Sequence, residues 1–181
     1  MRAKLIDDKP AIAVLGPVNG EDSDGLVATL SSSLASSGYT LIVSGYGQTA
    51  TIAERAARMQ GGAVCIVTEV DDTPTDGLTE GRTIMLRSSR FQCTESILEF
   101  ADALVVLPGD LQALASLVLV WSYGATEEGP YRPLVLLGED WPRIVKSLAN
   151  AAGLDRRQRA MVTFATAADE AVEALRYYIA P

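Results

Sequence analysis

The chain has 181 residues, a formal net charge of −8 and an apolar content of 48%. This length fits one domain, spanning residues 1–181, that can bury a sizeable core. Nucleic-acid binding draws most of its affinity from Lys and Arg, so the acidic balance argues against a nucleic-acid partner. A single phosphate is still compatible with this charge, because backbone N–H groups at a helix N-terminus can hold it.

The chain contains no histidine, which excludes His-based acid–base catalysis, His-ligated zinc and a Ser-His-Asp triad. Its two cysteines, Cys65 and Cys93, lack Cys-x-x-Cys spacing, so we expect no metal site. No apolar run reaches the length of a membrane helix, and residues 1–10 lack the apolar centre of a signal peptide. We therefore expect a cytoplasmic protein with no membrane partner.

Short apolar runs alternate with segments of helical period along the whole chain. We expect strands at residues 11–16, 40–44, 62–68, 83–86, 101–107, 133–138 and 161–165. Asp22, Ser23 or Asp24 can cap the first helix, which ends at Ser37-Gly38. Regular alternation of this kind predicts an α/β fold, a Rossmann-like three-layer α/β/α sandwich with a mostly parallel sheet.

A glycine-rich loop, residues 45–50, follows the second expected strand. Its Gly-x-Gly sequence lets the backbone approach a phosphate and directs N–H groups at it. The loop also fits a dinucleotide fingerprint, with Glu69 as the acidic partner, although that fingerprint usually follows the first strand. A third interpretation is that the glycines only permit a tight turn and close packing of helix on sheet.

Two further segments are candidates for contact with a ligand. Residues 69–81 are rich in Asp, Thr, Pro and Gly and predict an exposed loop, which could act as a lid. Arg87 and Arg90 lead into the next expected helix and could serve as phosphate ligands or as ordinary surface arginines.

The remaining candidates surround the apolar strand at 101–107. Pro108-Gly109 ends this strand, and a helix at 111–121 follows directly. Such a turn lies at the carboxyl edge of a parallel sheet, where open α/β sheets bind ligands. The candidate ligand- or phosphate-binding residues are Gly16, Pro17, Gly45, Tyr46, Gly47, Gln48, Thr49, Arg87, Arg90, Pro108, Gly109 and Asp110.

The sequence from Ala101-Asp102-Ala103 to Pro108-Gly109 resembles the nucleotide-binding region of the LONELY GUY (LOG), "lysine decarboxylase-like" superfamily. That superfamily also contains the molybdenum-cofactor carrier proteins. Its pattern is an Ala-Asp-Ala strand followed by Pro-Gly-Gly-x-Gly-Thr-x-x-Glu, and a glycine-rich loop stands where Gly45 and Gly47 lie here. The resemblance implies a Rossmann-like nucleotide-binding domain and extends over almost the whole chain.

The chain departs from this pattern at the residues that carry the family's chemistry. Asp110, Gln112, Ala113 and Ser116 stand where the family has Gly, Gly, Thr and the catalytic Glu, and Cys93 stands where it has an Arg. The family's hydrolysis of nucleoside 5′-monophosphates needs a carboxylate at the ribose and a cation at the phosphate. We therefore expect no catalytic residue of that mechanism in this chain.

The helix at 111–121 is apolar on every side, so its own domain or a partner must cover it. We expect a homodimer through this helix, which is also how LOG-like proteins assemble; the alternative is a helix wholly interior to one subunit.

Three functions agree with these observations. The first is a non-catalytic carrier or sensor of a small nucleotide-like ligand, either a nucleotide or a molybdopterin-type cofactor. The second is an enzyme of changed mechanism, either a phosphoribohydrolase with altered catalytic residues or an NAD-linked protein. The third is a dimeric scaffold subunit. We take the first as the prediction.

Overall fold

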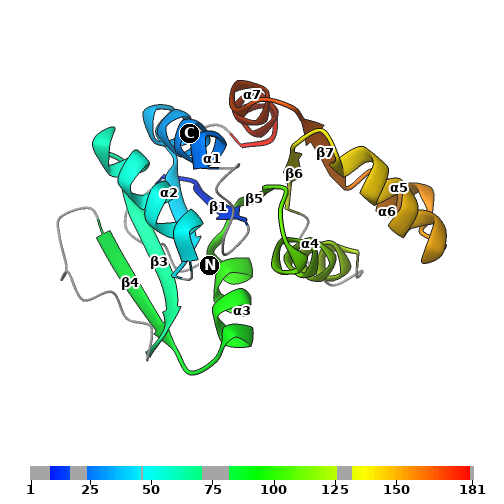
Figure 1. The fold of residues 1–181 in the computed structure, drawn as a ribbon, viewed down its shortest axis with the longest axis horizontal. Helices are drawn as coiled ribbons and strands as arrows, with labels where there is room; N and C mark the ends of the chain where they lie inside the picture. Colours follow the sequence, from blue (N-terminus) through cyan, green and yellow to red (C-terminus); the bar gives the residue numbers. More distant parts are fainter. Residues whose placement is uncertain (1–8, 17–23, 46, 71–81, 126–131, 180–181) are drawn as a thin grey trace.

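The structure is a computed structural model that describes residues 9–16, 24–45, 47–70, 82–125 and 132–179. Strands and helices alternate along the chain (Figure 1). The strands are β1 (Ala11–Leu15), β2 (Thr40–Ser44), β3 (Val64–Glu69), β4 (Arg82–Arg87), β5 (Ala103–Val106), β6 (Leu134–Leu137) and β7 (Val162–Ala165). The helices are α1 (Asp24–Ser36), α2 (Gly47–Met59), α3 (Arg90–Phe100), α4 (Leu111–Gly124), α5 (Trp141–Ala151), α6 (Arg156–Arg159) and α7 (Ala168–Tyr178).

The seven strands form one sheet in the order β4-β3-β2-β1-β5-β6-β7, and every pairing is parallel. From β1 the chain first builds outward to β4, and α3 then returns it to the other side of β1 as β5. Val14 accordingly pairs with Val43 on one side and with Val105 on the other. The predicted Rossmann-like α/β fold is confirmed.

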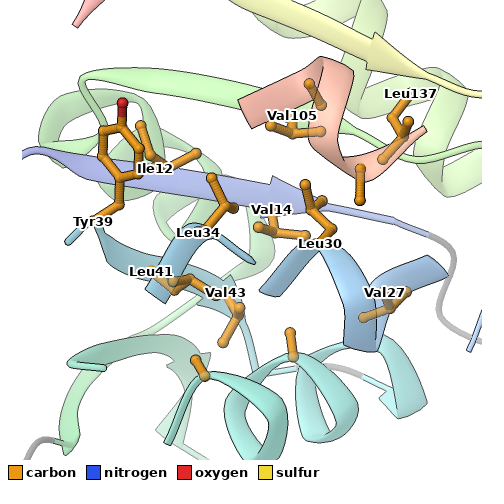
Figure 2. Packing of buried hydrophobic residues seen from close by; sticks show 14 of the residues in the cluster. Ile12, Val14, Val27, Leu30, Leu34, Tyr39, Leu41, Val43, Val105 and Leu137 are labelled. Carbon is orange, nitrogen blue, oxygen red and sulfur yellow. The ribbon is translucent and has the colours of Figure 1, made fainter. Parts of the chain in front are cut away.

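Two layers of helices enclose the sheet. Alternate residues of the strands pack against α1, α2 and α7 on one face and against α3, α4 and α5 on the other. Figure 2 shows the first of these cores, where Ile12 and Val14 of β1 meet Leu30 and Leu34 of α1. Strands buried on both faces need apolar residues at every position, which explains the unbroken apolar runs in the sequence.

Asp102 ties β1 to β5 at the amino edge of the sheet. Its carboxylate oxygen Oδ2 accepts a hydrogen bond from the Ala11 N–H at 2.9 Å, and its own N–H donates to the Ala11 carbonyl at 2.7 Å. The flanking Ala101 and Ala103 are fully buried. The Ala-Asp-Ala sequence is thus a structural element that starts both central strands, and it lies at the opposite end of the sheet from the candidate ligand residues.

Several boundaries differ from those expected. Helix α2 begins at Gly47, so Gln48 and Thr49 lie in its first turn and not in a loop before it. The short helix α6 was not predicted, because its four residues Arg-Arg-Gln-Arg carry no apolar period; a capping box between Asp155 and Gln158 starts it. The segment 71–81, most of the loop proposed as a lid, lies outside the described residues.

The sequence Thr166-Ala167-Ala168-Asp169 predicts a capping box for α7 with Asp169 as the acid, and the structure contradicts it. Ala167 is the N-cap and makes no side-chain hydrogen bond. The Glu170 carboxylate instead accepts hydrogen bonds from the N–H and the hydroxyl of Thr166, at 2.8 and 2.9 Å. These bonds hold the pKa of Glu170 below its usual value. Glu170 is one residue beyond the Asp169 that was expected to supply the acid, and its longer side chain reaches back to Thr166.

Helix α4 continues to Gly124, three residues beyond the expected end, and the single chain does not enclose it. Ala113, Leu117 and Val120 are buried against the sheet, whereas Leu111 and Val118 are exposed. The interpretation of a helix interior to one subunit is therefore wrong. Among the described residues, no helix is long and apolar enough to cross a membrane.

We expect Asp102→Ala to lower the free energy of unfolding by about 1–3 kcal/mol, because it leaves the buried Ala11 N–H without its acceptor. Asp102→Asn is the matched control, since its amide oxygen can still accept this bond, and it should lose much less. Urea unfolding followed by circular dichroism measures both. Equal midpoints for Asp102→Ala and the wild-type protein would contradict the role given to this bond.

Candidate functional site

The order of the strands reverses between β1 and β5, and three of the predicted ligand-binding segments lie around this point. Gly16 follows β1, and the N–H of Leu107, at the end of β5, donates to the Leu15 carbonyl at 2.8 Å. A Cβ on Gly16 would lie 2.9 Å from Cγ2 of Thr49 and 3.1 Å from Cδ1 of Leu107. The first turn of α2 and the end of β5 therefore touch the end of β1. A reversal of this kind is where open α/β sheets bind ligands.

The first turn of α2 directs its N-terminus at the same edge. It contains no acidic residue, and its first residue is Gly47. Thr49 is buried, whereas Gln48 is exposed and donates a side-chain hydrogen bond to Asp24 in the first turn of α1. The candidates Pro17 and Tyr46 lie outside the described residues.

Gly45 is required by packing against β3. A Cβ at this position would lie 2.3 Å from Cβ of Thr68, a fully buried residue of the neighbouring strand. The Gly45 N–H also donates to the Val67 carbonyl at 2.8 Å. The contact gives Gly45 a packing role against β3, and ligand roles for Gly45 and Gly47 stay predictions. Because the loop follows β2 and not β1, the dinucleotide fingerprint is displaced by one strand from its usual place.

The turn between β5 and α4 is already occupied by a carboxylate of the chain itself. Asp110 precedes the first residue of α4, and its Oδ1 accepts a hydrogen bond from the Ala113 N–H at 3.1 Å. This is the bond of an N-cap, which satisfies one of the free donors of the helix. Asp110 therefore competes with an incoming anion at α4, and its use as a ligand residue stays a prediction.

Gly138 is a residue of this edge that the sequence did not single out. It follows β6 with φ of +143°, and a Cβ there would lie 2.9 Å from Cγ of Pro108. The contact places Pro108 against the end of β6. The glycine at the end of an expected strand was a signal for a special backbone conformation, but nothing in the sequence indicated its contact with Pro108.

The structure does not bring Arg87 to the reversal point. Arg87 ends β4, three strands from β1, which corresponds to about 14 Å at the usual spacing of strands. Its guanidinium donates to the Ser96 hydroxyl on α3, to the Leu86 carbonyl and to the Met85 sulfur. Arg90 is the first residue of α3. Arg87 thus joins the edge strand to α3, and its use as a phosphate ligand stays a prediction.

The residues in the places of the family's Arg and Glu carry no charge at this edge. Cys93 is 2% exposed and packs in the core between α3 and the sheet, and Ser116 is half-buried on α4. Within the ranges that the structure describes, no three His, Cys, Asp or Glu side chains form a group that could hold a metal ion. The chemistry of the edge is therefore that of backbone donors, hydroxyls and carboxylates.

No protein-family model matches this sequence, and no curated protein matches it. Solved structures do match. The molybdenum cofactor carrier protein from Chlamydomonas reinhardtii is 19% identical and superposes with a TM-score of 0.68 over 93% of this chain and 97% of that one. The molybdenum cofactor binding protein from the phototrophic bacterium Rippkaea orientalis is 17% identical, with a TM-score of 0.72 over 94% and 97%.

A DNA-processing protein has a similar fold. DNA processing protein A from Helicobacter pylori, described as binding single-stranded DNA, is 13% identical and superposes with a TM-score of 0.64 over 94% of this chain and 81% of that one. At these identities the matches establish the fold alone. The chain has the fold of the molybdenum cofactor carrier proteins, as the resemblance in its sequence predicted.

We expect Gly45→Ala to destabilise the protein by about 1–3 kcal/mol, because the new methyl group overlaps the Thr68 side chain in a packed interior. Gly25→Ala is the matched control: Gly25 lies in α1 with no neighbouring atom within 4 Å, so alanine should be neutral or stabilising by about 0.5–1 kcal/mol. Thermal and urea unfolding measure both variants. A Gly45→Ala protein as stable as the wild type would show that the loop can move away from β3.

We expect both thiols to stay unreactive in the folded protein. Burial raises the pKa of the Cys65 thiol to about 12, with Arg87 lowering it in part, and Cys93 is as deeply buried. A disulfide reagent at pH 8 should therefore modify both cysteines only after unfolding in urea, because the thiolate is the reactive form. Rapid modification of the native protein would mean that α3 opens from the sheet, and Cys93→Ser would identify the thiol concerned.

Proposed function

We propose that this protein is a non-catalytic carrier or sensor that binds a nucleotide-type ligand at the carboxyl edge where β1, β2 and β5 end. The observation that carries the proposal is the meeting of Gly16, Thr49 and Leu107 at the reversal of strand order. Glycine at the end of β1 lets Thr49 and Leu107 pack close to the backbone, and the first turn of α2 adds N–H donors beside it. Structures with this fold include proteins described as carrying or binding the molybdenum cofactor.

The two helix N-termini at the edge suit different parts of such a ligand. The first turn of α2 has no acidic side chain, so its N–H groups and positive dipole end suit a phosphate. The N-terminus of α4 has its Ala113 N–H bonded to the Asp110 carboxylate. We therefore assign the phosphate of a nucleotide or molybdopterin-type ligand to α2, and only uncharged or cationic groups to the turn before α4.

The absence of catalysis is part of the proposal. Hydrolysis of a base–ribose bond requires a free carboxylate near the ribose and a cation at the phosphate. Around the reversal point the described residues offer the Asp110 carboxylate, which caps α4, and the Asp24 carboxylate, which accepts a hydrogen bond from Gln48. Arg87 lies three strands away. A rebuilt hydrolase remains the alternative that a turnover measurement addresses. Single-stranded DNA is not the proposed ligand, because the net charge of −8 opposes a polyanion.

We further propose that two copies associate through α4. Its exposed apolar side chains have no cover in the single chain, and burying such a face is the usual reason for a small α/β domain to dimerise. If the protein binds no ligand, dimer formation through α4 would be its function, and it would act as a scaffold subunit.

A proton NMR titration of AMP into the protein tests the ligand site. We expect line broadening of the AMP signals, and no free adenine over time. Gly47→Asp should abolish the broadening, because it places a negative charge in the first turn of α2 where the phosphate is assigned. The fold should survive, since an acidic residue suits a helix N-terminus. Gly47→Asn is the control of nearly equal size, and it should retain most of the binding.

Each result of this titration has a distinct meaning. Broadening that Gly47→Asp does not change would remove α2 from the site. Free adenine would mean that the protein hydrolyses AMP with residues other than those of the family pattern. Sharp AMP lines with the wild-type protein would contradict nucleotide binding.

A further inference from the structure

Helix α4 carries an exposed apolar stripe and, beside it, an apolar groove. The stripe consists of Leu111, Ala115, Val118 and Ser122, which recur every three or four residues and so lie along one side of the helix. Leu111 is 79% exposed and Val118 is 45% exposed. No residue of α4 carries a charge, although the chain as a whole has a net charge of −8.

The groove runs between α4 and the α5–α6 segment and has a volume of about 440 Å³. Its apolar lining consists of Val118, Trp121, Ala125, Leu148, Ala152 and Leu154. Val118 thus belongs both to the stripe and to the groove. The groove lies towards the C-terminal end of α4, and Leu111, the most exposed apolar residue of the helix, lies at its N-terminal end.

Three polar groups around the stripe and the groove have partners within the chain. The Ser122 hydroxyl donates to the Leu119 carbonyl at 2.8 Å, and the Trp121 indole N–H donates to the Gln158 carbonyl at 2.8 Å. The side-chain oxygen of Gln158 accepts from the Asp155 N–H at 3.0 Å. Covering this surface therefore leaves these groups satisfied, which removes the main cost of burying them.

The geometry points to a second copy of this chain as the occupant, bound antiparallel with Leu111 of each copy inserted into the groove of the other. A two-fold axis at Val118 places residues at equal distances on either side of it opposite one another. Leu111 lies seven residues before Val118, and Ala125 lies seven residues after it. Such an axis therefore brings Leu111 against the partner's Ala125, inside the partner's groove.

The charge of the protein is compatible with this occupant, because α4 carries no charged residue. Two copies that each carry a net charge of −8 repel one another, so they approach best through a surface that carries no charge. An isologous interface must also be complementary to itself, and an apolar projection and an apolar groove on the same helix meet that condition. Ala115 is small and exposed, which allows the two helices to pack closely.

Cysteine crosslinking tests the register, that is, the antiparallel alignment of the two α4 helices about Val118. This inference rests on the proposed association through α4 and adds the orientation of the two copies. Val118→Cys should crosslink to its own copy with a short bismaleimide, because packed helix axes are about 8–10 Å apart. Leu111→Cys should not, since the two Leu111 positions are about 21 Å apart along antiparallel helices. The wild-type protein, whose two cysteines are buried, is the control for background reaction.

Substitution by aspartate tests the inserted side chain. Leu111→Asp should convert a dimer of about twice the 19.2 kDa chain mass into a monomer in sedimentation velocity, because it places a carboxylate in the apolar groove. Phe91→Asp is the matched control: Phe91 is 84% exposed in the first turn of a different helix, α3, and the variant should remain a dimer. Aspartate suits the start of a helix in both variants, so both should fold.

The outcomes separate the association from the register. A monomeric wild-type protein would overturn both the association and the inserted Leu111. Three results would leave the association standing and overturn the antiparallel register. They are a dimer that crosslinks through Leu111→Cys, a dimer that fails to crosslink through Val118→Cys, and a dimer that survives Leu111→Asp. Crosslinking at Val118 alone, together with dissociation by Leu111→Asp, supports the inference.

Discussion

Strand β1 pairs with a parallel strand on each side, and the other features of the structure depend on this double pairing. Asp102 joins β1 and β5 where they begin, and the hydrogen bond from Leu107 to Leu15 joins them where they end. Between these points the apolar side chains of β1 reach both cores. Because the chain builds outward on one side of β1 and then on the other, the helices α1 and α4 that follow the two central strands pack on opposite faces of the sheet. The reversal point is the physical origin of the candidate site.

The sequence predicts the elements of the fold well because burial and period determine them. Every residue of β1 is buried, and an unbroken apolar run indicates such a strand. The predictions are less accurate where a local hydrogen bond or a single contact decides the outcome. The cap of α7 depends on Glu170 reaching Thr166, and α6 depends on a capping box in a segment without apolar period. These details depend on side-chain reach, which residue spacing alone does not determine.

The same distinction applies to the site. The positions of Gly16 and Pro108 at one edge follow from the alternation of strands and helices, so the sequence could place them together. The strand order, however, depends on which strands pair, and it puts Arg87 three strands from Gly16. Both Asp110 and Gly45 were predicted to contact the ligand, and each has a local role that only the contacts in the structure reveal. Asp110 caps α4, and Gly45 makes room for Thr68.

Helix α4 connects the two surfaces that the proposals use. Asp110 caps its first turn at the carboxyl edge, and Leu111 is the next residue in the chain and the most exposed apolar residue of the helix. A ligand that moves the first turn of α4 would therefore also move the side chain assigned to the partner's groove. Thermodynamic linkage makes this coupling reciprocal: to the extent that binding alters dimer affinity, dimerisation alters ligand affinity by the same factor. If a ligand moves this turn, the cap residue and the exposed leucine, adjacent in sequence, would join the two equilibria.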